Sequence, residues 1–282
     1  MGQTADKATG FQGDKLYQER ARLALPILIR QAKAAGQTIS YEDLAAELGM
    51  PNPRNLNYPL GCIGDELNRL SSKWRREVPP IQALVVSKGA SVPGRGFDTF
   101  LKARGKIWKT PEERKAILKT YIAEIANYPY WDEVLSELGL KPVASKIEDI
   151  IDKAMSFGGG EGPEHKALKE YVRSHPECVG LPAGSAKGSV EAPLPSGDSI
   201  DVLFDRQDRI FAVEVKPAST PIHDVARGLF QCVKYRAVLQ ARADFNGDSR
   251  QVSVLLALGG EMPAVLLPLR NSLGVAVVER VG

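Results

Sequence analysis

The chain has 282 residues, of which 43% are hydrophobic and 25% are charged, so it has enough apolar residues to build a folded core. This composition excludes an intrinsically disordered chain, and the length favours two domains over one. The formal net charge of +3 is too small to indicate a polyanionic partner by itself.

The three cysteines, Cys62, Cys178 and Cys232, are far apart in the chain, and none belongs to a C-x-x-C pair. This spacing excludes a disulfide framework and a zinc knuckle. The first residues are polar, and no apolar run reaches the roughly 18 residues of a membrane span. We therefore expect a cytoplasmic protein without a signal peptide or a membrane partner.

The first part of the chain is predicted to be mostly helical. Residues 16–35 have a helical pattern, in which Pro26 is expected to cause a kink or a break. Ser40 is the expected N-cap of a helix over residues 41–48, which a glycine ends. After a turn with two prolines, residues 58–74 form the second helix of this pair.

An apolar run over residues 81–86 and a basic, glycine-rich loop over residues 88–96 follow the helix pair. Two short helices followed by a β-hairpin with a basic tip resemble a winged helix, in which the second helix enters the major groove and the wing touches the backbone. The resemblance implies a DNA-targeting domain, and a purely structural or partner-docking helical domain is the alternative. The DNA contacts expected near the second helix and on the wing are Arg54, Asn55, Asn57, Lys88 and Arg95.

The basic residues are concentrated further along this part of the chain. Residues 1–150 carry about +4 and residues 151–282 about −1. Thr110, Pro111 and Glu113 form the signature of a helix start, with Thr as N-cap, Pro at the first position and Glu at the third. The basic side chains around this start either contact phosphates or form a solvated face, and those predicted to contact DNA are Lys102, Arg104 and Lys106.

A domain boundary is predicted where a helical pattern over residues 146–156 meets the three glycines at 158–160. The predicted domains are therefore 1–157 and 158–282. In the second domain the order is helix, three strands, helix, strand, with a further strand at the end, which is an α/β domain. The expected elements are a helix over 162–174, strands over 189–194, 199–204 and 209–216, a helix over 224–242, and strands over 252–258 and 275–278.

Charged residues interrupt two of these apolar strands. Side chains alternate along a strand, so Glu214 and Lys216 point to one face of the third strand. Asp201 interrupts the apolar run over residues 200–204, one hairpin earlier, and is expected on the adjacent strand. An unpaired carboxylate in so apolar a strand is costly, so Asp201 needs a partner or a metal ion.

An Asp, a short hairpin and then Glu-x-Lys in an apolar strand resemble the PD-(D/E)XK nuclease superfamily, whose members have a restriction-endonuclease-like αβββαβ core. The resemblance covers about residues 161–258. Members often carry a Glu on the preceding helix, where Glu164 shares a face with Leu168, Tyr171 and Val172 and is expected to point toward the protein. Gln231 and Tyr235 match the Gln-x-x-x-Tyr spacing of RecB-like members, and Gly228 would let their helix approach its neighbours closely.

The chemistry that the resemblance implies is hydrolysis of a phosphodiester with Mg²⁺, for which Mn²⁺ could substitute. A hard divalent ion suits two carboxylates plus water and a substrate phosphate. The expected ligands are Asp201, Glu214, the backbone carbonyl of Val215 and, directly or through water, Glu164. Lys216 would orient and deprotonate the attacking water or stabilise charge on the phosphate. Gln231 and Tyr235 would position nucleic acid or the shell around the metal.

Other residues near the motif are given ordinary structural roles. Ser199 stands two positions before the motif Asp, no Pro immediately precedes that Asp, and Pro217 directly follows the motif Lys, which ends strand hydrogen bonding there. Asp198 is interpreted as a turn-forming residue rather than as the motif Asp. His165 is expected to be a surface or capping histidine, and His223 a cap or loop residue.

The sequence therefore predicts a Mg²⁺-dependent endonuclease that cleaves DNA, most simply double-stranded DNA, in restriction, anti-phage defence or repair. One alternative is a winged-helix regulator that retains the nuclease fold without cutting. A second alternative is a nuclease that acts on RNA or branched DNA. A homodimer is expected only by analogy, because single-site nucleases of this fold often dimerise to cut both strands.

Overall fold

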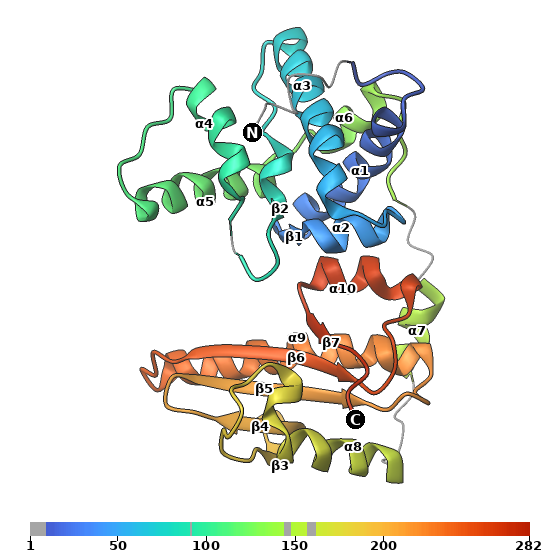
Figure 1. The fold of residues 1–282 in the computed structure, drawn as a ribbon, viewed down its shortest axis with the longest axis vertical. Helices are drawn as coiled ribbons and strands as arrows, with labels where there is room; N and C mark the ends of the chain where they lie inside the picture. Colours follow the sequence, from blue (N-terminus) through green and yellow to red (C-terminus); the bar gives the residue numbers. More distant parts are fainter. Residues whose placement is uncertain (1–9, 91, 144–147, 157–161) are drawn as a thin grey trace. The chain divides into compact units, whose positions relative to one another are not determined.

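The computed structural model describes residues 10–90, 92–143, 148–156 and 162–282, and the chain divides into two units at Ala144/Ser145 (Figure 1). Helix α7, Glu148–Ser156, belongs to the second unit, where Ala154 shares a hydrophobic cluster with Val225 and Leu229 of helix α9. The division therefore precedes α7, whereas the glycines predicted a boundary after it. Those glycines, at 158–160, lie outside the described residues.

The N-terminal unit is helical, as its sequence pattern indicates. Ser40 caps α2, because its Oγ accepts a hydrogen bond from the amide of Asp43 at 3.0 Å. Pro26 lies inside α1 without interrupting it, and it is buried with its apolar neighbours, so packing outweighs the lost backbone hydrogen bond. The helices are α1 Leu16–Lys33, α2 Tyr41–Glu47, α3 Asn57–Trp74, α4 Asp98–Ala103, α5 Pro111–Asn127 and α6 Trp131–Glu137, with 3₁₀ turns at Pro53–Leu56, Ile81–Leu84 and Arg95–Phe97.

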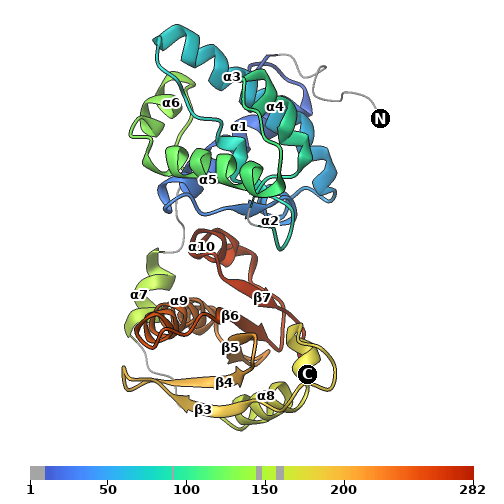
Figure 2. The ribbon, with the colours of Figure 1, turned by 90° about the vertical axis from the view of Figure 1, so that its left-hand side faces the viewer.

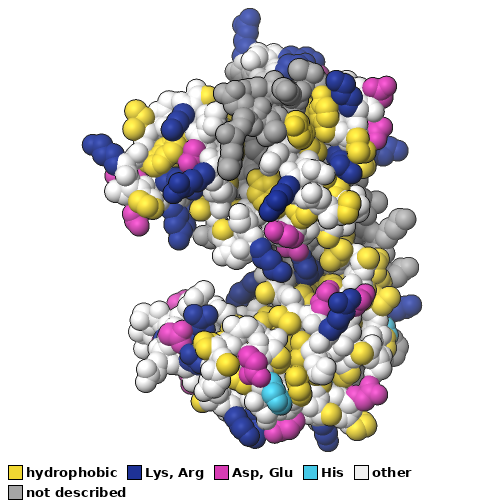
Figure 3. All heavy atoms as spheres, in the orientation of Figure 1, with side chains coloured by type: hydrophobic (Ala, Val, Ile, Leu, Met, Phe, Trp, Pro, Cys, Tyr) yellow, Lys and Arg dark blue, Asp and Glu magenta, His cyan; other side chains and the backbone are white. Residues whose placement is uncertain are grey.

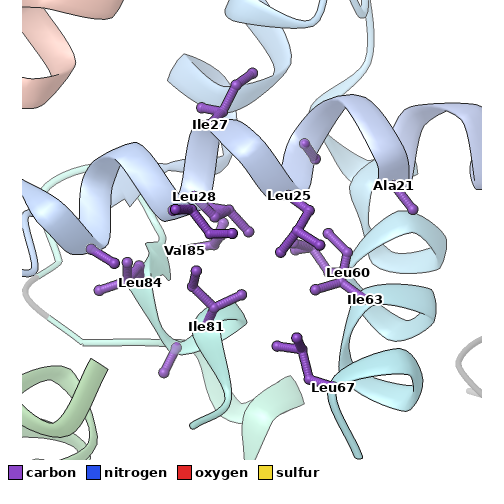
Figure 4. Packing of buried hydrophobic residues seen from close by; sticks show 14 of the residues in the cluster. Ala21, Leu25, Ile27, Leu28, Leu60, Ile63, Leu67, Ile81, Leu84 and Val85 are labelled. Carbon is purple, nitrogen blue, oxygen red and sulfur yellow. The ribbon is translucent and has the colours of Figure 1, made fainter. Parts of the chain in front are cut away.

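The core of this unit forms where α1, α3 and the turn at Ile81–Leu84 meet (Figure 4). Leu25 and Leu28 of α1 are fully buried, as are Ile63 of α3 and Ile81 of the turn. Burying four such side chains contributes roughly 1.5–3 kcal/mol each before conformational entropy is subtracted. The helix pair α1 and α3 is thus fixed by packing, and α2 is attached to it.

The predicted winged-helix hairpin is wrong. Strand β2, Val85–Val86, pairs in parallel with strand β1, Ile39–Ser40, and not with a strand that follows it. Beyond β2, the described residues form a loop, the turn at Arg95–Phe97 and α4, with no returning strand. The run over residues 81–86 does not alternate between buried and exposed positions, so it enters the core as a turn instead of lying on a two-faced ribbon.

From α8 onward, the C-terminal unit has the predicted order of helix, three strands, helix and strand, and the predicted further strand at the end is present, preceded by a helix that the sequence pattern did not predict. Its sheet has the strand order β3-β4-β5-β6-β7, antiparallel from β3 to β5 and parallel from β5 to β7. The elements are α8 Pro163–Ser174, β3 Ser189–Pro193, β4 Ser199–Asp205, β5 Arg209–Lys216, α9 Ile222–Phe245, β6 Gln251–Leu258, α10 Leu267–Leu273 and β7 Ala276–Val278. Short 3₁₀ turns lie at Pro176–Val179 and Ala264–Leu266.

Helices α8 and α9 lie on opposite faces of this sheet (Figure 2). Val213 and Val215 of β5 are buried in a cluster with residues of α8. Ile210 and Ala212 of the same strand are buried in a cluster with residues of α9. The predicted alternation along β5 is confirmed, and it directs Glu214 toward the α9 side of the sheet.

Candidate active site

One cavity of about 500 Å³ in the C-terminal unit brings together the side chains that the sequence pattern singled out. It lies where β4 begins, β5 ends and the first turns of α8 and α9 approach the sheet. We call it the acidic cavity. The predicted site residues that line it are Glu164, Asp201, Glu214, Lys216, Gln231 and Tyr235.

The strand register places Asp201 and Glu214 together. Val202 of β4 pairs with Val213 of antiparallel β5. Asp201 directly precedes the first of these residues and Glu214 directly follows the second, so both carboxylates lie at the same end of neighbouring strands. Both side chains are removed from solvent, at 9% and 1% relative exposure. The sheet therefore buries two acids side by side.

Asp201 is held by two donors. Its Oδ2 accepts a hydrogen bond from the backbone amide of Val215 at 2.8 Å, and it lies 3.3 Å from His165 Nε2. Burial acts to raise the pKa of Asp201, but the hydrogen bond and charge of His165, together with the amide of Val215 and the charge of Lys216, lower the pKa below its ordinary value. Asp201 is therefore kept as a carboxylate.

His165 belongs to this site, so its predicted role as a surface or capping histidine is wrong. Its Nε2 lies 2.9 Å from the carbonyl oxygen of Val215 as well as 3.3 Å from Asp201 Oδ2. The hydrogen bond to Asp201 raises the pKa of His165 against the effect of burial. The imidazole thus contacts two of the oxygen groups that the sequence analysis assigned to a metal ion.

Only one of the two carboxylate oxygens of Glu214 has a partner among the described residues. Its Oε1 lies 2.7 Å from Lys216 Nζ, whereas its buried Oε2 has no hydrogen-bond partner among the described residues. Burial, followed by the charge of Asp201, raises the pKa of Glu214 to about 7, against the opposing charge of Lys216. An unpaired buried carboxylate oxygen is costly, which indicates a position suited to a cation or a proton.

Helix α9 closes the cavity. The hydroxyl of Tyr235 donates to the carbonyl of Ser199 at 2.9 Å, and Gln231 Nε2 lies 3.5 Å from that hydroxyl. The Oε1 atom of Gln231 is buried and has no partner in the described part of the chain. A Cβ atom at Gly228 would lie 3.1 Å from Lys216 Cε, so the glycine provides space for the lysine stem.

Glu164 lies at the rim and not inside, so the prediction that it points inward is wrong. Its side chain is exposed and accepts a hydrogen bond from Ser219 Oγ. The cavity also contains Asp224 and Arg227, which the sequence reasoning missed and which form an ion pair at 3.2 Å. Asp224 and Arg227 precede Gln231 by seven and four residues, so all three lie on one face of α9. This spacing was the sequence signal that could have assigned them to the site.

The donor set suits a hard divalent cation. Among the described residues, no group of three or more His, Cys, Asp or Glu side chains is arranged around a common metal position. The site instead offers two carboxylates and the carbonyl of Val215, which are oxygen ligands of the kind that Mg²⁺ prefers. The unpartnered Oε2 of Glu214 and the raised pKa of that acid beside Asp201 are the features that a cation would relieve. The residues present therefore fit the ion.

The residues predicted to contact DNA lie in different surroundings within the N-terminal unit. Exposed side chains near the start of α3 are Arg54, Asn55 and Asn57, and Lys88 is exposed after β2. Arg95, Lys102 and Lys106 line a second cavity. Arg104 differs, because its Nη2 donates to Asn68 Oδ1 at 2.6 Å and its guanidinium lies 3.7 Å from the ring centroid of Phe100. The contacts of Arg104 are thus made within the unit.

Asp198, the other Asp near the motif, does not line the acidic cavity. It accepts a hydrogen bond from Ser196 Oγ at 2.6 Å and forms an ion pair with Lys234, in the turn before β4. It therefore has the contacts of a turn residue.

No protein-family model, no curated protein and no solved structure matches this chain. In the part of the chain that is described, no helix is both long enough and apolar enough to cross a membrane. The side-chain geometry of the two cavities is therefore the basis for a functional assignment.

Proposed function

We propose that the chain is a Mg²⁺-dependent nuclease that hydrolyses phosphodiester bonds of DNA. The observation that supports this most directly is the placement of two buried carboxylates, Asp201 and Glu214, and the ammonium of Lys216 in one cavity at the end of two neighbouring strands. Buried acids alone would repel a phosphate, so these three side chains suit a site that would also hold a divalent cation.

The architecture supports a restriction-endonuclease-like core. Helix α8, the antiparallel strands β3 to β5, helix α9 and the parallel strand β6 follow in the αβββαβ order of that fold. The acids stand on the second and third strands, where the PD-(D/E)XK pattern requires them.

The residues that would hold the ion are Asp201, Glu214 and the carbonyl of Val215, with Glu164 available at the rim. Bound there, Mg²⁺ would polarise the scissile phosphate and lower the pKa of a bound water, and Mn²⁺ would serve similarly.

Lys216 provides positive charge beside the phosphate position. Its ammonium lies 2.7 Å from Glu214 Oε1, and its stem packs over Gly228. Held in this way, the ammonium would stabilise charge that builds on the phosphate oxygens and orient the attacking water. Gln231, whose Oε1 is buried and unpartnered in the described structure, would orient water or a phosphate ester at the α9 side.

A second candidate function is DNA binding without cleavage. The observation that favours it is the position of His165 Nε2, which contacts both Asp201 Oδ2 and the carbonyl of Val215. In that arrangement the imidazole occupies hydrogen-bonding positions that an ion would need. The two candidates differ in whether a divalent ion produces cleavage.

The test is conversion of supercoiled plasmid to nicked and linear forms in Mg²⁺, in Mn²⁺ and in EDTA. Wild-type protein is expected to cleave with either metal and not in EDTA, and Asp201→Ala is expected to be inactive. Asp198→Ala is the matched control, because Asp198 lies three residues away and outside the cavity. Equal cleavage by both variants would contradict the assignment, and retention of DNA with no metal-dependent nicking would establish the second candidate.

A further inference from the structure

A cavity of about 740 Å³ lies in the N-terminal unit, between the loop that precedes α4, helix α4 itself and the start of α5. Its wall is strongly basic, and we call it the basic cavity. The cationic residues that line it are Arg95, Lys102, Lys106, Lys109, Arg114 and Lys115, and Asp98 is the acidic residue among its lining.

Two acids near the basic cavity, Asp98 and Glu113, already have partners within the unit. Asp98 forms an ion pair with Arg114 at 2.7 Å. Glu113 turns back to the helix start, where its carboxylate accepts hydrogen bonds from the amides of Lys109 at 2.6 Å and Thr110 at 3.4 Å. Among the described residues, no ion pair involves the other five cations of the wall. The cavity therefore has a surplus of positive charge.

This surplus has an energetic consequence. Like charges gathered around one hollow repel one another, and the low-dielectric walls of a cavity concentrate their field. Figure 3 shows Lys and Arg side chains gathered over α4 and α5 on the visible face of this unit. A bound polyanion would remove the repulsion, whereas a solvated helix face would need no shared concavity.

The backbone segments of the wall are held together by contacts within the unit. Arg114 Nη2 donates to the carbonyls of Pro93 and Gly94, both at 2.9 Å, while the same side chain pairs with Asp98 of α4. One guanidinium thus ties the loop and α4 to α5. A preformed wall lowers the ordering cost of binding.

The lining also has an apolar part. Ile107 is 85% exposed, and Trp108 is partly buried with its side chain lining the cavity. Exposed apolar and aromatic surface beside cations suits a ligand that has both phosphates and a sugar or a base. Inorganic phosphate alone would leave this surface unused.

We propose that the basic cavity binds consecutive phosphates of a DNA strand, with a sugar or base against Ile107 and Trp108. This inference rests on the proposed function in taking DNA as the substrate. It moves the main DNA contact away from the start of α3, where Arg54 is the cation of the predicted set, to a cavity lined by several. A free nucleoside triphosphate has the same phosphate chemistry and is the other source of ligand.

The experiment measures binding of a labelled DNA duplex by fluorescence anisotropy over a range of salt concentrations in EDTA, where cleavage does not occur. The triple variant Lys102→Ala, Lys109→Ala, Lys115→Ala is compared with Lys33→Ala, Lys73→Ala, Lys141→Ala. All six lysines are exposed and in the same unit, and the control lysines do not line the cavity. Each lost phosphate contact reduces the magnitude of the slope of log K against log salt concentration by about 0.9. The cavity variant lacks three lysines, so the magnitude of its slope should be smaller by about 2 to 3, and it should bind DNA roughly 10- to 100-fold more weakly.

Equal losses in the two triple variants would show a diffuse charge effect and overturn the proposal. As a local readout, DNA should change the tryptophan fluorescence of the wild type but not of Trp108→Phe, and an unchanged response in that variant would also overturn it. ATP that quenches Trp108 without competing with DNA would assign the cavity to a free nucleotide instead. Binding is measured without metal, so a protein that binds through the cavity but never cleaves would contradict only the nuclease proposal.

Discussion

The two cavities of this protein differ in whether their charged side chains have partners of opposite charge. In the acidic cavity most charged groups are buried or half-buried and are matched, Lys216 against Glu214 and Arg227 against Asp224, and the Oε2 atom of Glu214 is left without a partner among the described residues. In the basic cavity most cations, such as Lys102, are exposed and have no acidic partner in the described structure. Matched buried charges fix atoms in position, as chemistry requires, whereas unmatched exposed charges attract a ligand at long range. The comparison predicts that cleavage and binding can be lost separately.

Among substitutions that keep both metal-binding acids, the largest effect is expected from Lys216→Ala. Without the ammonium beside Glu214, plasmid cleavage in Mg²⁺ should fall roughly 10²- to 10³-fold, because charge on the phosphate oxygens is no longer stabilised. DNA affinity in EDTA should change little. If Lys216→Ala lost cleavage and DNA affinity to the same extent, the acidic cavity would also be a main site of DNA binding, which would contradict the comparison.

The next effect concerns stability and pH. Glu214 has a pKa of about 7 in the folded chain, above its ordinary value of 4.5. As pH rises from 4.5 to 7, the unfolded chain loses this proton while the folded chain keeps it, so the free energy of unfolding should fall across that window and level off above it. Glu214→Gln should remove this slope and, above pH 7, be more stable than wild type by on the order of 3 kcal/mol.

Urea unfolding of both proteins at several pH values in EDTA would measure the slope. Asp198→Asn is the control, because Lys234 and Ser196 lower the pKa of Asp198, and its titration lies below the window. A wild-type slope that persists in Glu214→Gln would assign the pH dependence to other groups.

His165→Ala should affect the metal requirement. The imidazole contacts both Asp201 and the carbonyl of Val215, so it competes with an ion for these oxygens. Its removal is expected to lower the Mg²⁺ concentration for half-maximal cleavage roughly tenfold, which is similar in size but opposite in sign to the effect of losing a group that orients metal ligands. His223→Ala, outside the cavity lining, should leave that concentration unchanged. A higher requirement in His165→Ala would show that the histidine orients Asp201 for the ion.

Gly228→Ala tests how closely α9 controls Lys216. The new methyl group would lie 3.0 Å from Leu256 Cδ1 and 3.1 Å from Lys216 Cε, so the lysine stem must shift by a few tenths of an ångström. Cleavage should fall about fivefold. Stability should change by no more than about 1 kcal/mol, because the helix gain from alanine offsets the crowding. Unchanged cleavage kinetics would show that the lysine position tolerates the shift.

The smallest effect on binding is expected from Arg104→Ala. Arg104 is held by Asn68 and by the face of Phe100, so its removal should lower the stability of the N-terminal unit by about 1 kcal/mol. DNA affinity should change less than about twofold. Lys102→Ala, two residues away in the cavity wall, should weaken binding more, and the opposite ranking would place the phosphate contacts outside the cavity.

Local patterns were sufficient for much of the architecture. Ser40 and Thr110 were predicted to cap the N-termini of helices, and both caps are present in the structure. Alternation in β5 separated the face of Val213 from that of Glu214. These predictions succeeded because caps and pleats depend on residues within a few positions of each other.

Longer-range arrangements could not be obtained in this way. The run at residues 81–86 pairs in parallel with Ile39–Ser40, a partner that no turn signal between them indicates. His165 and Val215 are fifty residues apart in the chain, yet they are in hydrogen-bond contact. Helical spacing places His165 on the face of the buried Leu168 and Val172, but that spacing does not identify Val215 as its partner.

The sequence by itself determined which groups are available for chemistry, the acids and lysine on two apolar strands and a basic surplus in the first half of the chain. Only the tertiary structure decided which charges meet a partner. The strand register brings Asp201 beside Glu214. In the N-terminal unit, Asp98 forms an ion pair with Arg114, whereas Lys102 has no acidic partner in the described part of the unit. The physical reason is that charge depends on residue type, whereas pairing and desolvation depend on neighbours that only the folded chain assembles.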